Sequence, residues 1–102
     1  MRGKDKGAMI LWIAYEAGSA VGDAREEVHN AIRTAAGARN VHRAMPNVWL
    51  VDSEESPSAW VDTVEPALGK GDRVIVTKLQ RGAAAMNITP ATDWLKIHRE
   101  SF

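Results

Sequence analysis

A run of seven almost continuously apolar residues constrains the fold of this chain more than any other feature of its sequence. Residues 9–15, with the sequence MILWIAY, carry no charge and include two β-branched and two aromatic side chains. Seven residues suit a strand, whereas a buried helix usually runs to ten or more. A strand that is apolar on both faces must be covered on both faces. The run therefore predicts the central strand of a sheet.

Two later segments repeat apolar residues at spacings of three and four, which predicts helices. The first spans residues 22–36, with Asp23 at the positive end of the helix dipole and Gly37 where a left-handed terminal residue is favoured. The second begins at Ser56, which can cap free amides and is followed by a proline. Pro66 is expected to kink or end its last turn, because proline deletes a helix hydrogen bond.

Three further segments complete the expected elements. The stretch "RNVHRAMPNVWLVDS" predicts a hairpin with a polar outer strand around Val41 and an apolar inner strand at residues 48–51. Residues 73–79 alternate between two faces and predict a fourth strand. Thr89 and Pro90 repeat the signal of a cap followed by proline, which favours a short terminal helix. The alternative is a terminal strand that adds to a partner.

The resulting order is strand, helix, strand, strand, helix, strand and tail, which is that of the ferredoxin-like βαββαβ fold. We expect an α+β sandwich formed by a single domain of residues 9–102, preceded by a disordered leader of residues 1–8. Two helices would cover one face of an antiparallel sheet, with the first and third strands in the middle and the polar second strand on an edge. The other face must be covered too, so we expect a homodimer that forms through it and is sealed by the terminal segment.

Composition narrows the classes of function. The chain has 102 residues and no cysteine, which excludes disulfides, cysteine-ligated zinc, iron–sulfur clusters and thiol chemistry, and fits a reducing cytoplasm. No stretch reaches the roughly 20 apolar residues that span a membrane, so we expect a cytoplasmic protein with no membrane partner. Thirteen basic and thirteen acidic residues cancel. Binding of nucleic acid must therefore come from the distribution of charge rather than from its sum.

The charges are unevenly distributed along the chain. Residues 29–50 contain no acidic residue, whereas residues 52–72 hold six carboxylates against one lysine. This predicts separate positive and negative patches, although such patches are also common on the solvated faces of neutral domains. The basic side chains that we select as nucleic-acid contacts are Arg33, Arg39, Arg43, Lys78 and Arg81.

Several short motifs together resemble one group of small proteins. They are "LWIAYEAG" in the first strand, His42 seven residues before Trp49 in "VWLVDS", the second helix with Pro66, "DRVIVTKL", and a closing "DWLK". Over residues 9–96 the chain is similar to the small SinR-family proteins, which are relatives of the CRISPR-associated spacer-acquisition subunit and, more distantly, of virulence-associated protein D. The resemblance implies a ferredoxin-like homodimer of prokaryotic or phage origin.

The resemblance also implies a site. In that broader family the first strand ends in Tyr-Asp, and the aspartates of two subunits face each other and are linked to nuclease activity with a divalent metal such as Mg or Mn. The matching positions here are Tyr15 and Glu16, and His42 matches as well. A glutamate is still a hard oxygen ligand, but its extra methylene moves the carboxylate, and magnesium demands near-octahedral geometry. The departure weakens the expectation of catalysis.

Without the resemblance, the same residues leave alternatives open. Glu16 alone supplies one ligand, so a metal nuclease would need the second copy across a dimer axis, and the alternative is a solvated strand end. The three histidines lack the spacing of a metal site. Trp12 and Trp49 could stack on bases, but packing in the core or at the dimer interface is favoured, and we assign both, together with Trp94, to that interface.

We predict a homodimeric module that binds double-stranded nucleic acid or acts as a scaffold, with weak or no catalysis. Its contacts would be directed to phosphates and would read shape, with little base specificity. One alternative is a metal-dependent endonuclease that uses Glu16 from each subunit. Another is a module that binds a protein partner through its acidic second helix, residues 54–65.

Overall fold

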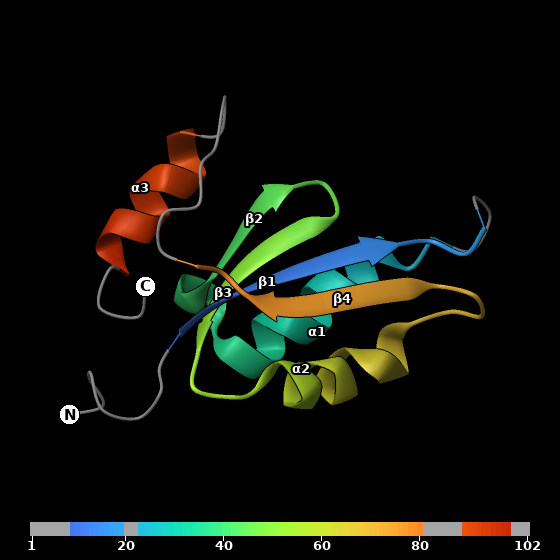
Figure 1. The fold of residues 1–102 in the computed structure, drawn as a ribbon. Coiled ribbons are helices and arrows are strands. Elements are labelled where there is room, and N and C mark those ends of the chain that lie inside the picture. Colours follow the sequence, from blue (N-terminus) through green and yellow to red (C-terminus); the bar gives the residue numbers. More distant parts are fainter. Residues whose placement is uncertain (1–8, 20–22, 81–88, 99–102) are drawn as a thin grey trace.

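A four-stranded antiparallel sheet forms the centre of the computed structural model, which describes residues 9–19, 23–80 and 89–98. The predicted leader and Arg81 lie outside these residues. The strands lie in the order β2, β3, β1, β4 (Figure 1), with the bounds β1 Met9–Glu16, β2 Val41–Met45, β3 Val48–Ser53 and β4 Arg73–Lys78. The element order and the strand order are both consistent with the predicted ferredoxin-like arrangement.

Strand β1 is paired along both edges, as its apolar sequence predicts. Leu11 lies opposite Val51 of β3 and opposite Lys78 of β4. The side chains of Ile10, Leu11 and Ile13 are fully buried although they alternate between the two faces of the sheet. The polar strand β2 pairs with β3 and forms one edge, which confirms the predicted hairpin.

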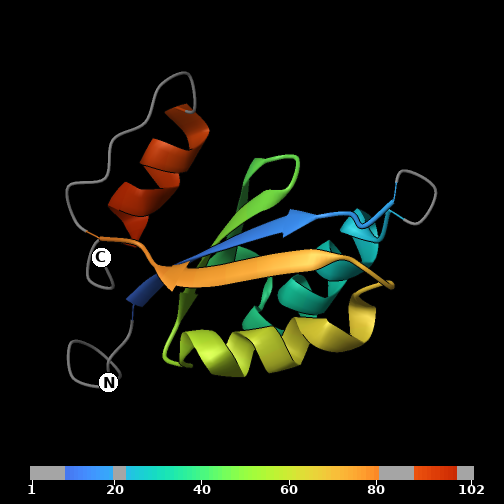
Figure 2. The ribbon, with the colours of Figure 1, turned by 45° about the vertical axis from the view of Figure 1, so that its right-hand side comes forward.

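Helices α1 (Arg25–Ala36) and α2 (Pro57–Val64) cover one face of the sheet (Figure 2). Helix α1 begins three residues later than predicted, because the Asp23 carboxylate accepts a hydrogen bond from the amide of Arg25 (2.9 Å) in a turn that precedes the helix. Gly37 ends α1 with φ of 90°, and its amide donates to the carbonyl of Arg33 (2.8 Å). The helix therefore ends at Gly37, as the sequence predicts.

The signals for the second helix are confirmed at both ends. The hydroxyl of Ser56 accepts a hydrogen bond from the amide of Ala59 (3.1 Å) and caps α2. The α-helix stops at Val64, and Pro66 lies in a short 3₁₀ helix, η3 (Glu65–Ala67). A second 3₁₀ turn, η2 (Ala38–Asn40), links α1 to β2.

The main core lies between the sheet and these two helices. Its buried members are Leu11, Ile13, Tyr15, Val28, Ile32, Trp49, Val51, Trp60 and Val64. Trp49 is fully buried inside the single chain, so the assignment of this residue to a dimer interface is wrong. It faces the helices because it lies on the same side of β3 as Val51, two residues away.

A third helix, α3 (Thr89–Ile97), covers part of the opposite face near β2 (Figure 1). A separate small cluster forms there from Ile10, Leu50 and Ala91, with Trp12 and Trp94 packed against it. The terminal helix is thus confirmed, and it buries Ile10 and Leu50 without a partner chain. None of the described helices is long and apolar enough to cross a membrane.

Candidate functional site

Glu16 ends β1 and lies directly opposite Arg73 of β4. The two side chains form an ion pair and are 63% and 77% exposed. The Glu16 carboxylate is therefore paired with a guanidinium from the same chain. Among the described residues there is no group of three or more His, Cys, Asp or Glu side chains that could hold a metal ion. The donors that one chain places here do not fit Mg²⁺ or Mn²⁺, which take several oxygen ligands.

Tyr15 points away from Glu16, because successive residues of a strand face opposite sides of the sheet. It is 4% exposed, and its hydroxyl donates to Asp72 Oδ2 (2.9 Å) and accepts from the amide of Ala24 (2.8 Å). Burial raises the pKa of Tyr15, and the hydrogen bond to Asp72 and its charge raise it further. The phenol is held neutral in a structural network, so the structure separates the two residues that the resemblance pairs.

Asp72 is the centre of that network and was missed by the sequence analysis. Its carboxylate accepts hydrogen bonds from the amide of Gly18 (2.7 Å), the amide of Gly69 (2.8 Å) and the hydroxyl of Tyr15. The two amides are the main reason why the pKa of Asp72 lies below its usual value. Asp72 ends the sequence GKGD (residues 69–72), and nothing in it signals that this segment meets the loop after β1.

His42 lies on edge strand β2, away from Glu16. It is opposite Leu50, which is opposite Trp12, so His42 is two strands and four residues from Glu16. Its ring stacks on Trp94 of α3 with the centroids 6.2 Å apart, and burial lowers the pKa of His42. The structure therefore brings His42 to the α3 side of the sheet and does not join it to a catalytic site with Glu16.

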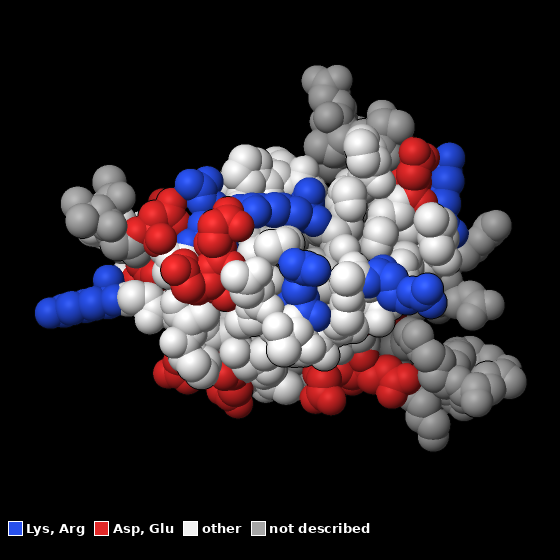
Figure 3. All heavy atoms as spheres, turned by 180° about the vertical axis from the view of Figure 1, so that it is seen from behind, with Lys and Arg blue, Asp and Glu red and all other residues white. Residues whose placement is uncertain are grey.

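Three of the five predicted nucleic-acid contacts come from one continuous segment. Arg33 lies in the last turn of α1 and Arg39 in η2, and both side chains are exposed. Figure 3 shows basic side chains spread across the rear of the molecule, where α1 lies, with acidic side chains at one end and along the lower margin. Lys78 ends β4, at the other edge of the sheet, and Arg81 lies outside the described residues.

Arg43, the third arginine of this segment, is already engaged within the chain. Its Nε and Nη2 atoms donate to the carbonyl of Pro46 (2.9 and 2.7 Å), and Nη2 pairs with Glu26 (3.1 Å). The guanidinium also lies over the Trp49 ring, 5.3 Å from its centroid. Arg43 therefore fixes the β2–β3 hairpin against α1, and less of its charge is available to a ligand.

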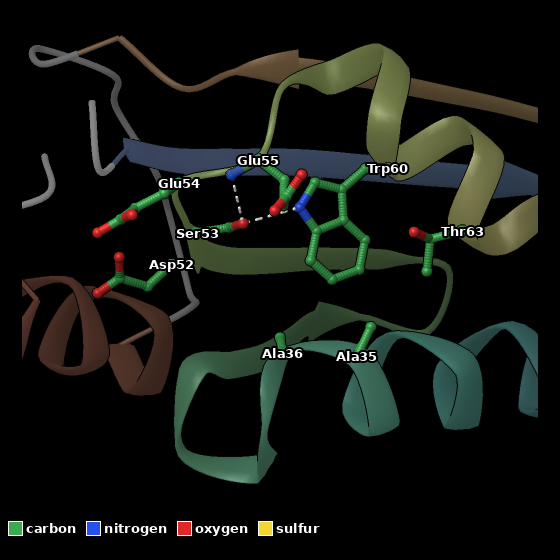
Figure 4. A pocket seen from close by; sticks show the side chains of 8 residues that line it. All are labelled: Ala35, Ala36, Asp52, Ser53, Glu54, Glu55, Trp60 and Thr63. Carbon is green, nitrogen blue, oxygen red and sulfur yellow. Dashed lines mark hydrogen bonds between the residues drawn. The ribbon is translucent and has the colours of Figure 1, made fainter. Parts of the chain in front are cut away.

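An acidic hollow of about 470 Å³ opens where β3 ends between α1 and α2 (Figure 4). Its rim carries Asp52, Glu54 and Glu55, and Trp60 forms a wall. The hydroxyl of Ser53 accepts a hydrogen bond from the Trp60 Nε1 atom (3.0 Å) and fixes that wall. A second hollow, of about 610 Å³, adjoins Glu16 at the edge of the sheet.

No known family model matches this chain, and no curated protein matches it.

Proposed function

We propose that this chain is a nucleic-acid-binding or scaffold module of ferredoxin-like fold, similar to CRISPR spacer-acquisition subunits, with little or no catalysis. The observation that carries the proposal is the placement of the acid-free segment. Residues 29–50 form most of α1, η2, β2 and the first residues of β3, and the side chains of Arg33 and Arg39 in this segment are exposed. Exposed guanidinium groups pair with phosphate oxygens, often through two hydrogen bonds.

The expected ligand is a duplex held by its phosphates. Arg33 and Arg39 are carried by a helix end and a short turn, from which a guanidinium can reach the phosphates of a duplex. Because the net charge of the chain is zero, binding must be local and sensitive to salt.

A charge-reversal pair tests the proposal directly. The double variant Arg33→Glu with Arg39→Glu should weaken the retention of duplex DNA or RNA at low salt and lower the magnitude of the slope of log affinity against log salt by about two. The matched control is Lys70→Glu with Lys96→Glu, which changes the net charge equally but acts at exposed positions that are not among the predicted contacts. Equal loss in both variants, or no binding by the parent chain, would overturn the proposal.

The proposed assembly is a homodimer through the sheet face that α3 leaves open. Ile75 of β4 is 61% exposed on that face, beside the half-buried Trp12 and Ala14 of β1. Apolar side chains of this kind favour a packed partner. Light scattering of the full chain at micromolar concentration should give twice the chain mass of 11.1 kDa, and Ile75→Glu should shift it toward the monomer. A parent chain that is monomeric would contradict the assembly but not the duplex contacts.

The geometry gives the endonuclease alternative less support, because Glu16 is paired with Arg73 and the described residues contain no group of three or more potential metal ligands. Cleavage of nucleic acid that depends on magnesium or manganese, and that disappears in Glu16→Ala while the oligomeric state is unchanged, would support the endonuclease alternative. The protein-partner alternative rests on the acidic hollow beside α2 and on Val61, which is 36% exposed. The absence of duplex binding would favour that alternative.

A further inference from the structure

Strand β4 forms one edge of the sheet, and two backbone hydrogen bonds determine which of its residues face β1. The amide of Leu79 donates to the carbonyl of Ile10 (2.8 Å), and on the other side of β1 the amide of Tyr15 donates to the carbonyl of Asn47 (3.0 Å). In an antiparallel pair, residues that bond to the neighbouring strand alternate with residues that do not. The even-numbered residues of β1 therefore bond to β4, and the odd-numbered ones bond to β3.

The backbone of alternate β4 residues consequently faces away from the sheet. The even-numbered residues of β1 lie opposite residues 73, 75 and 77, whose N–H and C=O groups are used in the ladder. The N–H and C=O groups of Val74, Val76 and Lys78 point outward, and within the described ranges no strand lies on that side of β4. Three outward donors and three outward acceptors in a row are a template to which an extended chain can bind.

The other edge of the sheet is protected in ways that β4 is not. Strand β2 has a register shift between Arg43 and Met45, and α3 packs against it. Strand β4 keeps one register from Arg73 to Lys78, and its sequence contains no proline. Bulges, prolines and covering helices are common means by which proteins block the addition of a strand. Of the two edges, β4 is thus the one that is open to another strand.

The side chains along this edge define the kind of strand that fits it. Ile75 is strongly exposed on the open face of the sheet, and the hollow of about 610 Å³ is lined in part by Leu68, Val74 and Ile75. Arg73 and Lys78 lie at the two ends of β4, and both are exposed. Neighbouring strands are stabilised by apolar pairs and by pairs of opposite charge. The matching segment is therefore apolar or β-branched at its centre and acidic at its ends.

A second copy of β4 is a poorer match for this edge. The strand sequence RVIVTK has two basic residues and no acidic one, so pairing two copies brings no carboxylate from the added strand to either basic end. Arg73 already pairs with Glu16, but a guanidinium has five donors and can bind a second carboxylate. Charge complementarity therefore favours a strand from a different protein.

We propose that the β4 edge is a peptide-binding site, at which an extended segment of a partner protein with acidic ends adds to the sheet as a further strand. Hydrogen bonds to the backbone of Val74, Val76 and Lys78 provide the affinity, and Ile75 and the adjoining hollow select the side chains. The site lies at the opposite edge of the sheet from β2 and does not depend on duplex binding. It is also distinct from the acidic hollow beside α2.

Nuclear magnetic resonance of the full chain tests the site through the alternation of the β4 amides. The probe is a capped six-residue peptide, the length of β4, in which valine and threonine alternate between two terminal glutamates. In the free chain, the amides of Val74, Val76 and Lys78 should exchange with solvent roughly tenfold or more faster than those of Ile75 and Thr77. The peptide should slow the first set by about tenfold or more and leave the second set unchanged.

Two altered peptides separate the contributions to binding. A peptide methylated at its central backbone nitrogens cannot donate hydrogen bonds to the edge and should not bind. A peptide with lysine in place of both glutamates should bind roughly threefold to tenfold more weakly, because it meets Arg73 and Lys78 with like charges.

Variants of the chain test the same contacts from the other side. Val76→Pro removes an outward N–H but no hydrogen bond to β1, and proline is tolerated on edge strands, so peptide binding should weaken by about tenfold while circular dichroism stays that of the folded parent. Lys78→Glu should reduce or reverse the preference for the glutamate-ended peptide. Lys96→Glu makes the same change in charge at an exposed position of α3 and should leave that preference intact.

Three results would overturn the proposal. Outward amides that are already protected in the free chain would show that another strand, such as one from a second copy, covers the edge. Equal binding of the methylated peptide would show that backbone pairing is not the cause. Unchanged exchange of Val74, Val76 and Lys78 at a peptide concentration of about 1 mM would show that the edge does not take an added strand.

Discussion

The hydrogen bond between Trp49 and His29 makes the stability of the core depend on one imidazole. Trp49 is fully buried, and its Nε1 atom donates to His29 Nδ1 over 2.7 Å. An unprotonated Nδ1 is required to accept this bond. Replacing His29 with leucine leaves the indole N–H buried without its acceptor, which should lower the free energy of unfolding by about 1–3 kcal/mol. That is a large part of the roughly 5–15 kcal/mol available to a small domain.

The same bond predicts a pH dependence with a definite sign. Burial, together with the nearby Arg43 guanidinium, lowers the pKa of His29 in the folded chain. The unfolded chain therefore binds more protons in the titration range. The stabilising contribution is fully present above the ordinary imidazole value of 6.5, and it is lost as the pH falls below it toward the folded pKa. One proton can change the stability by at most about 1.4 kcal/mol per pH unit.

Urea unfolding, followed by far-ultraviolet circular dichroism at pH 7.5 and 5.5, measures both effects. His29→Gln retains an acceptor for Trp49, so it should cost less than His29→Leu at pH 7.5 and should lose less stability at pH 5.5 than the parent. The comparison isolates His29, because His42 and His98 are present in every variant. If His29→Leu is as stable as the parent, or if His29→Gln keeps the full pH dependence, the reasoning is refuted.

Three other substitutions have defined outcomes. Gly18→Ala should lower the melting temperature and the free energy of unfolding, by roughly 1–3 kcal/mol, because its Cβ would overlap the backbone of Gly71. Ser53→Ala should cost about 1–3 kcal/mol in urea unfolding at pH 7.5, since it removes the acceptor of the buried Trp60 indole; unchanged stability would contradict the hydrogen bond. The depressed pKa of Asp72 stabilises the fold above its ordinary value of 3.8, and this contribution is lost as the pH falls through the folded value. In Asp72→Asn, the free energy of unfolding should therefore fall less steeply with decreasing pH than in the parent. The same dependence on acid pH in both proteins would contradict this role of Asp72.

The fold was largely predictable because its signals are local. The apolar run of β1, the Ser56 cap and the stop near Pro66 each follow from residues within one turn or strand, and the structure places all three as expected. The order of these elements then left few topologies. What the sequence could not supply were the contacts between residues far apart in the chain. Trp49 was assigned to an interface because the sequence does not show which face of β3 is covered by α1. That choice depends on how β3 pairs with its neighbours.

The site was less predictable than the fold for the same reason. His29 accepts a hydrogen bond from Trp49, 20 positions later, and no pattern within α1 signals this contact. Asp72 was not singled out from the sequence, yet its carboxylate accepts hydrogen bonds from Tyr15 and Gly18 across more than 50 residues. Glu16 was a candidate metal ligand, but the residue opposite it on β4 is Arg73. Contacts of this kind depend on the register of the strands and on which loops meet in the fold. Neither can be read from a single segment of the sequence.

The central position of β1 also affects how the chain is made. Leu11 meets Val51 and Lys78, so the first strand to be synthesised pairs with residues 40 and 67 positions later. At roughly 5–20 residues per second, β1 waits about 3 to 13 seconds before its second neighbour exists. During that time the uncharged run MILWIAY is open to any other unpaired strand. Slow, nonlocal closure of the sheet is therefore the step at which this chain is most exposed to aggregation, and rapid capture of the β1 segment by a chaperone would protect it.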